Sequence, residues 1–277
     1  MLSGRRLPSL SPLRYPGGKA FFASELVSMI ERVPTPITVY AEPYAGGASA
    51  ALHLLAAGVV KSVLLNDADV RIYAVWHSVL TKPDEFIERI QTVDLTMETW
   101  RECMAVVAEP GNKPDLFQLG FATFFLNRTN RSGIVVGAGP IGGYDQSGKW
   151  LLGARFYRNT LADRVRWIGS KRRKIRASNL DGLSFLRECE KNEAGTFTFV
   201  DPPYIHAGSR LYYDGMTEKA HRKLAAHFHA KSRKHWAMTY DDCELVREMY
   251  GDLNIRDLRV QYSLQSRRSA NEVLIRP

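Results

Sequence analysis

Residues 36–67 read PITVYAEPYAGGASAALHLLAAGVVKSVLLND and decide the fold class of this chain. The stretch divides into a β-prone run, a turn rich in small residues, an apolar helix-prone run and a second strand-like run, at residues 36–41, 42–47, 48–57 and 62–66. The second strand-like run is followed by Asp67. Strand, glycine turn, helix, strand and acid, in this order, are typical of a nucleotide-binding βαβ unit.

The same α/β order returns in the second half of the chain. Residues 174–178 are predicted as a strand leading to Asp181, and residues 196–200 as a buried strand that runs into Asp201. A helix, a further strand and a terminal hairpin are then predicted at residues 217–233, 236–240 and 256–262 with 272–275. The two halves therefore predict one α/β domain.

The middle of the chain follows a different pattern. Helical stretches are predicted at residues 83–90, 97–107 and 116–126, and a glycine-rich passage follows at 133–153. A loop of that length inside a compact domain is usually functional or part of an inserted module. We therefore predict a catalytic α/β domain made of residues 14–80 and 167–277, an inserted and mainly helical domain of residues 81–166, and a flexible leader of residues 1–13.

Composition narrows the class of protein. The 38 Lys and Arg residues exceed the 29 Asp and Glu residues, which gives a net charge of +9 and favours a polyanionic partner, nucleic acid before anionic membrane. No run approaches the roughly 20 apolar residues of a membrane span. The three cysteines, Cys103, Cys189 and Cys243, are far apart, so neither a disulfide framework nor a zinc site is expected. These features predict a cytoplasmic protein without a metal.

The strongest chemical signal is Asp201-Pro202-Pro203-Tyr204, directly after a buried strand. A carboxylate and a backbone carbonyl are two acceptors in fixed geometry, which suits a substrate amino group with two N–H donors. The prolines add no competing N–H donors, and Tyr204 offers a flat face on which a planar base can stack. The alternative for such a tetrapeptide is an ordinary turn at the end of a strand.

These motifs give the chain a resemblance to the Dam-like family of DNA adenine-N6 methyltransferases, over almost its whole length. The motifs, in the family's order, are Tyr15-Pro-Gly-Gly-Lys19, Glu42-Pro-Tyr-Ala-Gly-Gly47, Asn66-Asp67, Phe125-Leu-Asn-Arg-Thr129 with Ser132-Gly133, Asp201-Pro-Pro-Tyr204 and Arg268-Ser-Ala-Asn-Glu-Val-Leu-Ile275. Cofactor motif first, recognition region in the middle and DPPY last is the alpha arrangement. The resemblance implies a Rossmann-like methyltransferase sheet with an inserted target-recognition domain.

The resemblance also implies S-adenosylmethionine as the cofactor. Its expected contacts are Tyr15, Lys19, Glu42, Pro43, Tyr44, Ala45, Gly46, Gly47, Asp67, Asp181 and Asp201. Glycine lets the backbone approach a ligand closely, and an acid after the second strand is placed to accept from ribose hydroxyls. Ordinary roles stay open for four of them: a helix N-cap for Asp67, a turn for Asp181, a solvated side chain for Lys19 and packing for Tyr15.

The expected reaction requires an adenine to leave the duplex, because a stacked base cannot reach a methyl donor. Asp201 and the Pro202 carbonyl would accept the two N6 hydrogens, with Pro203 and Tyr204 completing the catalytic loop and Tyr204 stacking on the base. The donor is already cationic, so the chemistry needs no metal. Holding both reactants in a near-attack geometry is the main catalytic contribution.

Basic residues crowd the stretch from Arg155 to Arg176. Expected phosphate contacts there are Arg155, Arg158, Lys171, Arg172 and Arg173. Candidate base-reading residues are Arg128, Asn130 and Arg131, because Arg suits guanine and Asn suits adenine in the major groove. An equally open role for these three is to hold the insertion together.

Three other functions remain as alternatives at this point. They are methylation of RNA adenine, nucleic-acid binding without turnover, and methylation of protein glutamine, although glutamine methyltransferases usually open the tetrapeptide with Asn rather than Asp. The expected partner is double-stranded DNA, and a cognate restriction endonuclease is a further candidate. A bacterial or phage-encoded, nucleoid-associated protein acting as a monomer or weak dimer is expected.

Overall fold

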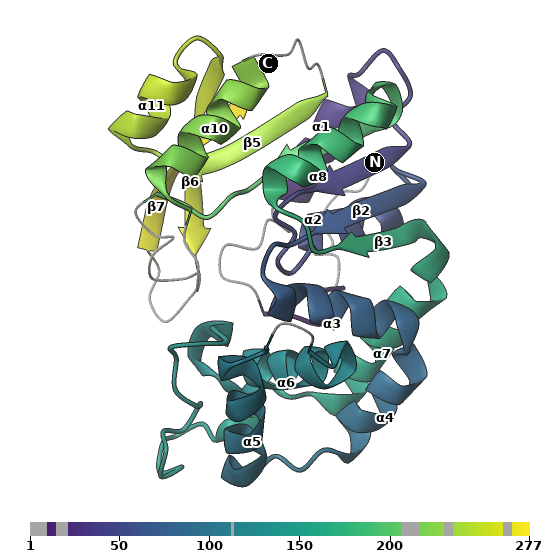
Figure 1. Ribbon diagram of the computed structural model, residues 1–277, viewed down its shortest axis with the longest axis vertical. Helices are drawn as coiled ribbons and strands as arrows, with labels where there is room; N and C mark the ends of the chain where they lie inside the picture. The colour runs from purple at the N-terminus through teal and green to yellow at the C-terminus, as the bar shows by residue number, and fades with distance from the viewer. Residues whose placement is uncertain (1–9, 15–21, 112–113, 206–215, 230–234, 263–267) are drawn as a thin grey trace.

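The computed structural model describes residues 10–14, 22–111, 114–205, 216–229, 235–262 and 268–277 (Figure 1). These residues contain a seven-stranded sheet in the order β3-β2-β1-β4-β5-β7-β6. The strands are β1 (Val39–Glu42), β2 (Ser62–Asn66), β3 (Ile175–Ser178), β4 (Thr196–Val200), β5 (Trp236–Asp241), β6 (Asn254–Tyr262) and β7 (Arg268–Arg276). Strands β1 to β5 run parallel to one another, and β7 is antiparallel to both β5 and β6.

Helices cover both faces of the sheet. Helices α1 (Ala23–Glu31), α2 (Ser49–Ala56) and α3 (Val70–Thr81) share a core with Tyr40 of β1 and Phe199 of β4. Helices α8 (Gly182–Cys189), α10 (Glu218–His229) and α11 (Glu244–Tyr250) pack on the other side with Val200 of β4 and Met238 of β5. Every residue of β4 is buried, as expected for a central strand of a parallel sheet covered on both faces.

A layer of four helices lies below the sheet in Figure 1: α4 (Pro83–Thr92), α5 (Met97–Ala108), α6 (Leu116–Thr129) and α7 (Arg158–Ser170). Helix α6 is its centre, because all residues from Leu119 to Thr129 are buried. It approaches α3 so closely that a Cβ on Gly120 would lie 2.3 Å from the carbonyl oxygen of Ala74. Only glycine therefore fits where α6 crosses α3, and this crossing joins the helical layer to the sheet.

The observed fold confirms the predicted class, a Rossmann-like α/β sheet with helical elements between its two halves. Strands β2 and β4 have the bounds that their sequences predict. Helices α1, α3, α7, α8 and α11 were not predicted as separate elements. Within the described residues, no helix combines the length and apolar character needed to cross a membrane.

The predicted leader needs a correction where the structure describes it. Residues 10–13 are not a free tail: Ser11, Pro12 and Leu13 are buried, and Leu13 belongs to the main core. The guanidinium of Arg164 in α7 donates a hydrogen bond to the Ser11 carbonyl at 2.8 Å. The segment is ordered because Leu13 packs its apolar side chain into the core. The basic residues on either side of the segment gave no sign of this packing. Residues 1–9 lie outside the described residues.

Candidate active site

The parallel strands β1 to β4 end at one edge of the sheet, and the predicted site residues that the structure describes follow these ends. The loop after β1 carries Tyr44 to Gly47, Asp67 follows β2, Asp181 follows β3, and the tetrapeptide opening with Asp201 follows β4. The strand order reverses between β1 and β4, which is where open α/β sheets bind their ligands. The candidate site is therefore this carboxyl edge of the sheet.

The glycine loop after β1 is fixed by three neighbours. The Ala45 N–H donates to the Asn66 carbonyl at 2.8 Å, and the Gly46 N–H donates to Asp67 Oδ2 at 2.9 Å. The Trp76 indole N–H of α3 donates to the Gly46 carbonyl at 2.9 Å. Gly46 has φ of +47°, a left-handed conformation that glycine adopts without strain. The loop is thus preorganised by contacts from β2 and α3.

The start of α2, which follows this loop, has no side-chain cap, because its N-cap residue is Ala48. The buried carboxyl group of Glu42 accepts hydrogen bonds from the Ala51 N–H at 3.2 Å and the Tyr40 hydroxyl at 3.1 Å. Burial raises the pKa of Glu42 to about 8 despite these two donors. At neutral pH the helix start therefore faces a mostly uncharged acid, which leaves the positive end of α2 suited to a ligand carboxylate.

Asp67 joins the glycine loop to β2 and does not cap the following helix. Its Oδ1 accepts from the Asp69 N–H at 3.0 Å while Oδ2 holds Gly46. Burial raises the pKa of Asp67 to about 7, although both backbone donors oppose the shift. The N-cap of α3 is Asp69, whose carboxylate accepts from the Arg71 N–H at 2.9 Å. The N-cap alternative for Asp67 is therefore wrong.

Asn66 fastens three loops together at the same edge. Its side-chain amide donates to the Pro43 carbonyl at 3.0 Å and to the Leu180 carbonyl at 2.9 Å. Its Oδ1 accepts from the Leu180 N–H at 2.9 Å and the Ser178 hydroxyl at 2.8 Å. In the sequence Asn66 stands out only as the neighbour of Asp67. Its role in holding these loops together is visible only in the structure.

The tetrapeptide after β4 is held by β5. Asp201 Oδ1 accepts from the Thr239 hydroxyl at 2.6 Å and from the Tyr204 hydroxyl at 3.1 Å. Asp241, at the end of β5, accepts from the Ile205 N–H at 3.1 Å. Thr239 and Asp241 were missed at the sequence level, because the sequence does not show that β5 pairs with β4. Thr239 thus fixes the orientation of the Asp201 side chain, and Asp241 fixes the backbone that follows Tyr204.

Tyr44 forms the wall between the glycine loop and α8. A Cβ on Gly182 would lie 2.5 Å from the Tyr44 hydroxyl oxygen, so the helix start must be glycine here. Burial raises the pKa of Tyr44, and the carboxylates of Asp181 and Asp67 add to the shift. Asp181 itself is exposed and caps α8, accepting from the Leu183 N–H at 3.0 Å and the Ser184 N–H at 3.2 Å.

The structure does not support Arg128 and Asn130 as base-reading residues. Arg128 is 5% exposed, and its guanidinium donates to the Arg155 carbonyl at 2.9 Å. Asn130 is fully buried and accepts from the Trp100 indole N–H at 2.7 Å. Burial at the end of α6 keeps both side chains away from solvent, so they hold the helical layer together. Arg131, the third candidate, is exposed.

The phosphate-contact prediction also needs correction at four positions. The guanidinium of Arg158 donates to the carbonyls of Ile90 and Val93, so it ties α7 to the end of α4. Lys171, Arg172 and Arg173 precede β3 and therefore lie at the amino edge of the sheet, opposite the edge that carries Asp201. The loops before and after parallel strands lie at opposite edges of a sheet, so these three cannot flank the candidate site. Arg155 is exposed.

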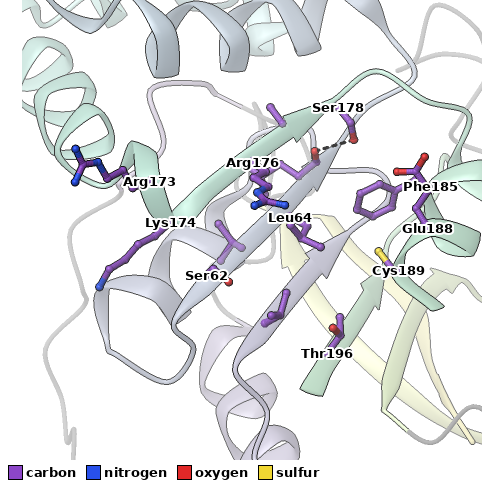
Figure 2. Close-up of a pocket in the computed structure, with 14 residues that line it drawn as sticks. Ser62, Leu64, Arg173, Lys174, Arg176, Ser178, Phe185, Glu188, Cys189 and Thr196 are labelled. Carbon is purple, nitrogen blue, oxygen red and sulfur yellow. Dashed lines mark hydrogen bonds between the residues drawn. The ribbon is translucent and has the colours of Figure 1, made fainter. Parts of the chain in front are cut away.

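Arg173 instead borders a hollow of about 550 Å³ on the open face of β2 and β3. Figure 2 shows Arg173 and Lys174 at one end of this hollow, Phe185 and Glu188 at the other, and Leu64 between them. Tyr15 and Lys19, predicted to contact the cofactor, lie outside the described residues.

The described residues contain no group of three or more His, Cys, Asp or Glu side chains arranged to hold a metal ion. Among solved structures, the chain is similar to two of the rRNA methyltransferase aviRa from Streptomyces viridochromogenes. One is 14% identical with a TM-score of 0.39, covering 95% of this chain and 86% of that one. The other is 15% identical with a TM-score of 0.38, covering 98% and 87%. These similarities are too low to bear on the substrate.

The sequence of the chain matches no curated protein. A family model does match: D12 class N6 adenine-specific DNA methyltransferase, over residues 15–264. The match includes the glycine loop, Asp67 and the tetrapeptide at Asp201, whose geometry is described above. As its motifs predicted, the chain belongs to the family of D12 class N6 adenine-specific DNA methyltransferases.

Proposed function

We propose that this methyltransferase transfers a methyl group from S-adenosylmethionine to N6 of an adenine that is flipped out of duplex DNA. The observation that carries the proposal is the fixed position of Asp201, which Thr239 and Tyr204 hold by hydrogen bonds at the carboxyl edge of the sheet. The preorganised loop at Gly46 lies at the same edge. A donor site and an acceptor site therefore adjoin across the reversal in strand order.

The residues at this edge fit the proposed cofactor. The uncapped start of α2 suits the methionine carboxylate, and the carboxyl group of Asp67 suits the ribose hydroxyls. Tyr44 and the neighbouring loop residues Pro43, Ala45 and Gly47 supply the wall between these two ends. When bound, S-adenosylmethionine supplies a methyl group that its positively charged sulfur already activates. The chain then has only to present an amino group with its lone pair directed at that methyl group.

Asp201 and the Pro202 carbonyl are the acceptors that we assign to the adenine amino group. Two acceptors hold its two N–H bonds, which draws the nitrogen lone pair out of conjugation with the ring. After transfer the nitrogen must lose one proton, and the Asp201 carboxylate is positioned to accept it. The Thr239 hydroxyl, 2.6 Å from Asp201 Oδ1, keeps the carboxylate plane fixed during this exchange.

Tyr204 is the surface on which we expect the flipped base to stack. Its ring lies 6.3 Å from that of Tyr240, at an angle of 33°, so Tyr240 supports it from the side of the sheet. Base stacking on an aromatic ring contributes roughly 1–3 kcal/mol, which offsets part of the cost of unstacking the adenine. The Tyr204 hydroxyl bonded to Asp201 would have to exchange partners when the base enters.

Labelled S-adenosylmethionine tests the proposal. The protein is incubated with unmethylated plasmid DNA, with total RNA or with protein extract, and the labelled product is identified after digestion. We expect N6-methyladenine in DNA, and loss of labelling for Asp201→Ala with retained binding of S-adenosylhomocysteine. Asp163→Ala, an exposed carboxylate on α7, is the matched control and should retain full turnover. Label only in RNA or protein, or near-normal turnover of Asp201→Ala, would overturn the proposal.

A further inference from the structure

Four arginines gather where the end of α6 meets the glycine-rich segment. They are Arg14, Arg128, Arg155 and Arg164. Within the described part of the chain, no ion pair includes any of them. Burial, together with the positive charges of the other three arginines, lowers the pKa of Arg128 to about 9. Repulsion of this kind favours binding of an anion.

A hollow of about 460 Å³ opens beside this cluster. The side chains of Arg14 and Arg155 reach it from the cluster, and Arg131 and Lys149 add two further cations. Among the described residues that line the hollow there is no Asp or Glu. The hollow is therefore a concave surface of one charge sign, in which field lines from the cations converge.

A tryptophan stands at the mouth of the same hollow. Trp150 is 63% exposed, and the Lys149 ammonium lies 5.8 Å from the centre of its ring. Leu151 is 53% exposed next to it. Large apolar side chains exposed side by side mark an interaction surface more often than isolated ones do.

The backbone around Trp150 is held by several close contacts. The side-chain amide of Gln146 donates to the carbonyls of Ile141 and Gly143, and its Oε1 accepts from the Leu152 N–H at 2.8 Å. A Cβ on Gly142 would lie 2.9 Å from the Trp150 carbonyl oxygen, so the chain crosses itself closely here. A backbone segment held in this way loses little entropy when it binds a ligand.

We propose that this hollow binds one strand of the duplex DNA substrate, with Arg14, Arg131 and Arg155 on a phosphate and the Trp150 ring stacked against a base or deoxyribose. The choice of DNA rests on the proposed function. The combination of several cations with one exposed aromatic ring fits a nucleotide strand, which offers a phosphate and a flat base at adjacent points. An anionic small molecule would use the cations but not the exposed ring.

The test measures binding of a short duplex of mixed sequence to the full-length protein. Trp150→Ala is expected to weaken binding about 5- to 150-fold, as loss of one base–aromatic stack does, and Trp150→Phe much less. Arg131→Ala and Arg155→Ala should each lower the slope of log Kd against log salt by about 1. Arg173→Ala is the matched control, because Arg173 is also exposed but lies at the amino edge of the sheet; its loss should leave both quantities unchanged.

Tryptophan emission gives a second readout. Duplex DNA should quench the emission of the wild-type protein, and Trp150→Phe should lack that quench while it still binds. Trp150 is exposed, so both variants are expected to keep the wild-type melting temperature. Wild-type affinity of Trp150→Ala, or a preference of the hollow for RNA over duplex DNA, would overturn the inference. If Trp150→Ala weakens DNA binding but the wild-type protein methylates no adenine, the inference stands and the proposed function fails. If Trp150→Ala binds DNA as tightly as the wild type and methylates adenine normally, the proposed function stands and the inference fails.

Discussion

The backbone N–H of Gly46 donates a hydrogen bond to Asp67 Oδ2 over 2.9 Å, so the glycine loop of β1 and the acid after β2 form one unit. The second carboxylate oxygen of Asp67 is held by the Asp69 N–H. In consequence the two groups that we assign to opposite ends of the cofactor cannot move independently. A change at either one is expected to alter the affinity for the cofactor before it alters the affinity for DNA.

Asp67→Asn tests this coupling. An amide keeps the size of the side chain but directs an N–H group at one of the two backbone donors, Gly46 or Asp69, so one donor loses its acceptor. We expect the Kd of S-adenosylhomocysteine, measured by calorimetry, to rise at least about tenfold. Asp115→Asn is the control, because Asn caps a helix as well as Asp does and the α6 cap, away from the candidate site, should survive. Equal losses in both variants would contradict the assignment of Asp67.

The stability of the protein should depend on pH through its buried acids. Burial raises the pKa of Glu42 to about 8 and the pKa of Asp67 to about 7, whereas both are near 4 in an unfolded chain. Between these values the folded chain binds more protons than the unfolded one. The free energy of unfolding therefore falls as the pH rises from about 4 to about 8, by at most about 1.4 kcal/mol per pH unit for each proton.

Glu42→Gln isolates one of these protons. Glutamine cannot titrate but its carbonyl oxygen still accepts from the Ala51 N–H, so urea unfolding of the variant should show a shallower decline with pH. Above pH about 8 the variant should be at least as stable as the wild type. Glu88→Gln removes an exposed carboxylate and should leave the pH dependence as it is. Parallel curves for Glu42→Gln and the wild type would show that Glu42 titrates normally.

Thr239 is predicted to act as a positioning residue for Asp201. Thr239→Val keeps the shape of the side chain and removes the donor at 2.6 Å, so the Asp201 carboxylate loses this hydrogen bond. We expect kcat to fall about tenfold with little change in the KM for S-adenosylmethionine. Thr239→Ser restores the hydroxyl and should recover most of kcat. A change in KM alone would assign Thr239 to packing.

Tyr204 has two separable groups, its ring and its hydroxyl. Tyr204→Phe keeps the ring and removes the bond to Asp201, so we expect it to retain most activity. Tyr204→Ala removes the stacking surface and should lower kcat/KM for DNA about 5- to 150-fold. Fluorescence of 2-aminopurine placed at a methylated position would report flipping directly. If the two variants lose activity equally, the hydroxyl rather than the ring carries the role.

Arg158 should matter for stability and not for DNA. Arg158→Ala leaves the carbonyls of Ile90 and Val93 without their donor at the end of α4, which is expected to cost about 1–3 kcal/mol of unfolding free energy. At a temperature where the variant stays folded, the salt dependence of DNA binding should match that of the wild type. A weaker dependence of the Kd for DNA on salt concentration in this variant would show that Arg158 does contact a phosphate.

The accuracy with which the sequence predicts the structure differs from one element to the next. Strand β4, TFTFV, was predicted with its bounds because a short apolar run between turn residues has one common explanation, a buried strand. Arg128 and Asn130 were misassigned because Arg and Asn are usually exposed. A signal was present: residues 116–126 are apolar on all sides, so the polar residues that follow in α6 are buried as well.

The basic run before β3 shows a second kind of limit. Lys171 to Arg173 are near Asp181 in the sequence, but a strand separates them and places them at opposite edges of the sheet. That separation follows from the parallel order of the strands and was deducible. The roles of Thr239 and Asp241 were not, because the pairing of β5 with β4 depends on a strand order that no local pattern encodes.

Helix α3 touches both the candidate site and the helical layer. Its Trp76 holds the Gly46 carbonyl, and its Ala74 lies against Gly120 of α6. Two residues of one rigid helix thus report on two partners. If α6 shifts when the hollow beside Arg14 and Trp150 is filled, α3 is the part that carries the displacement to the glycine loop. Through helix α3, binding of a ligand in the hollow can therefore change the shape of the glycine loop.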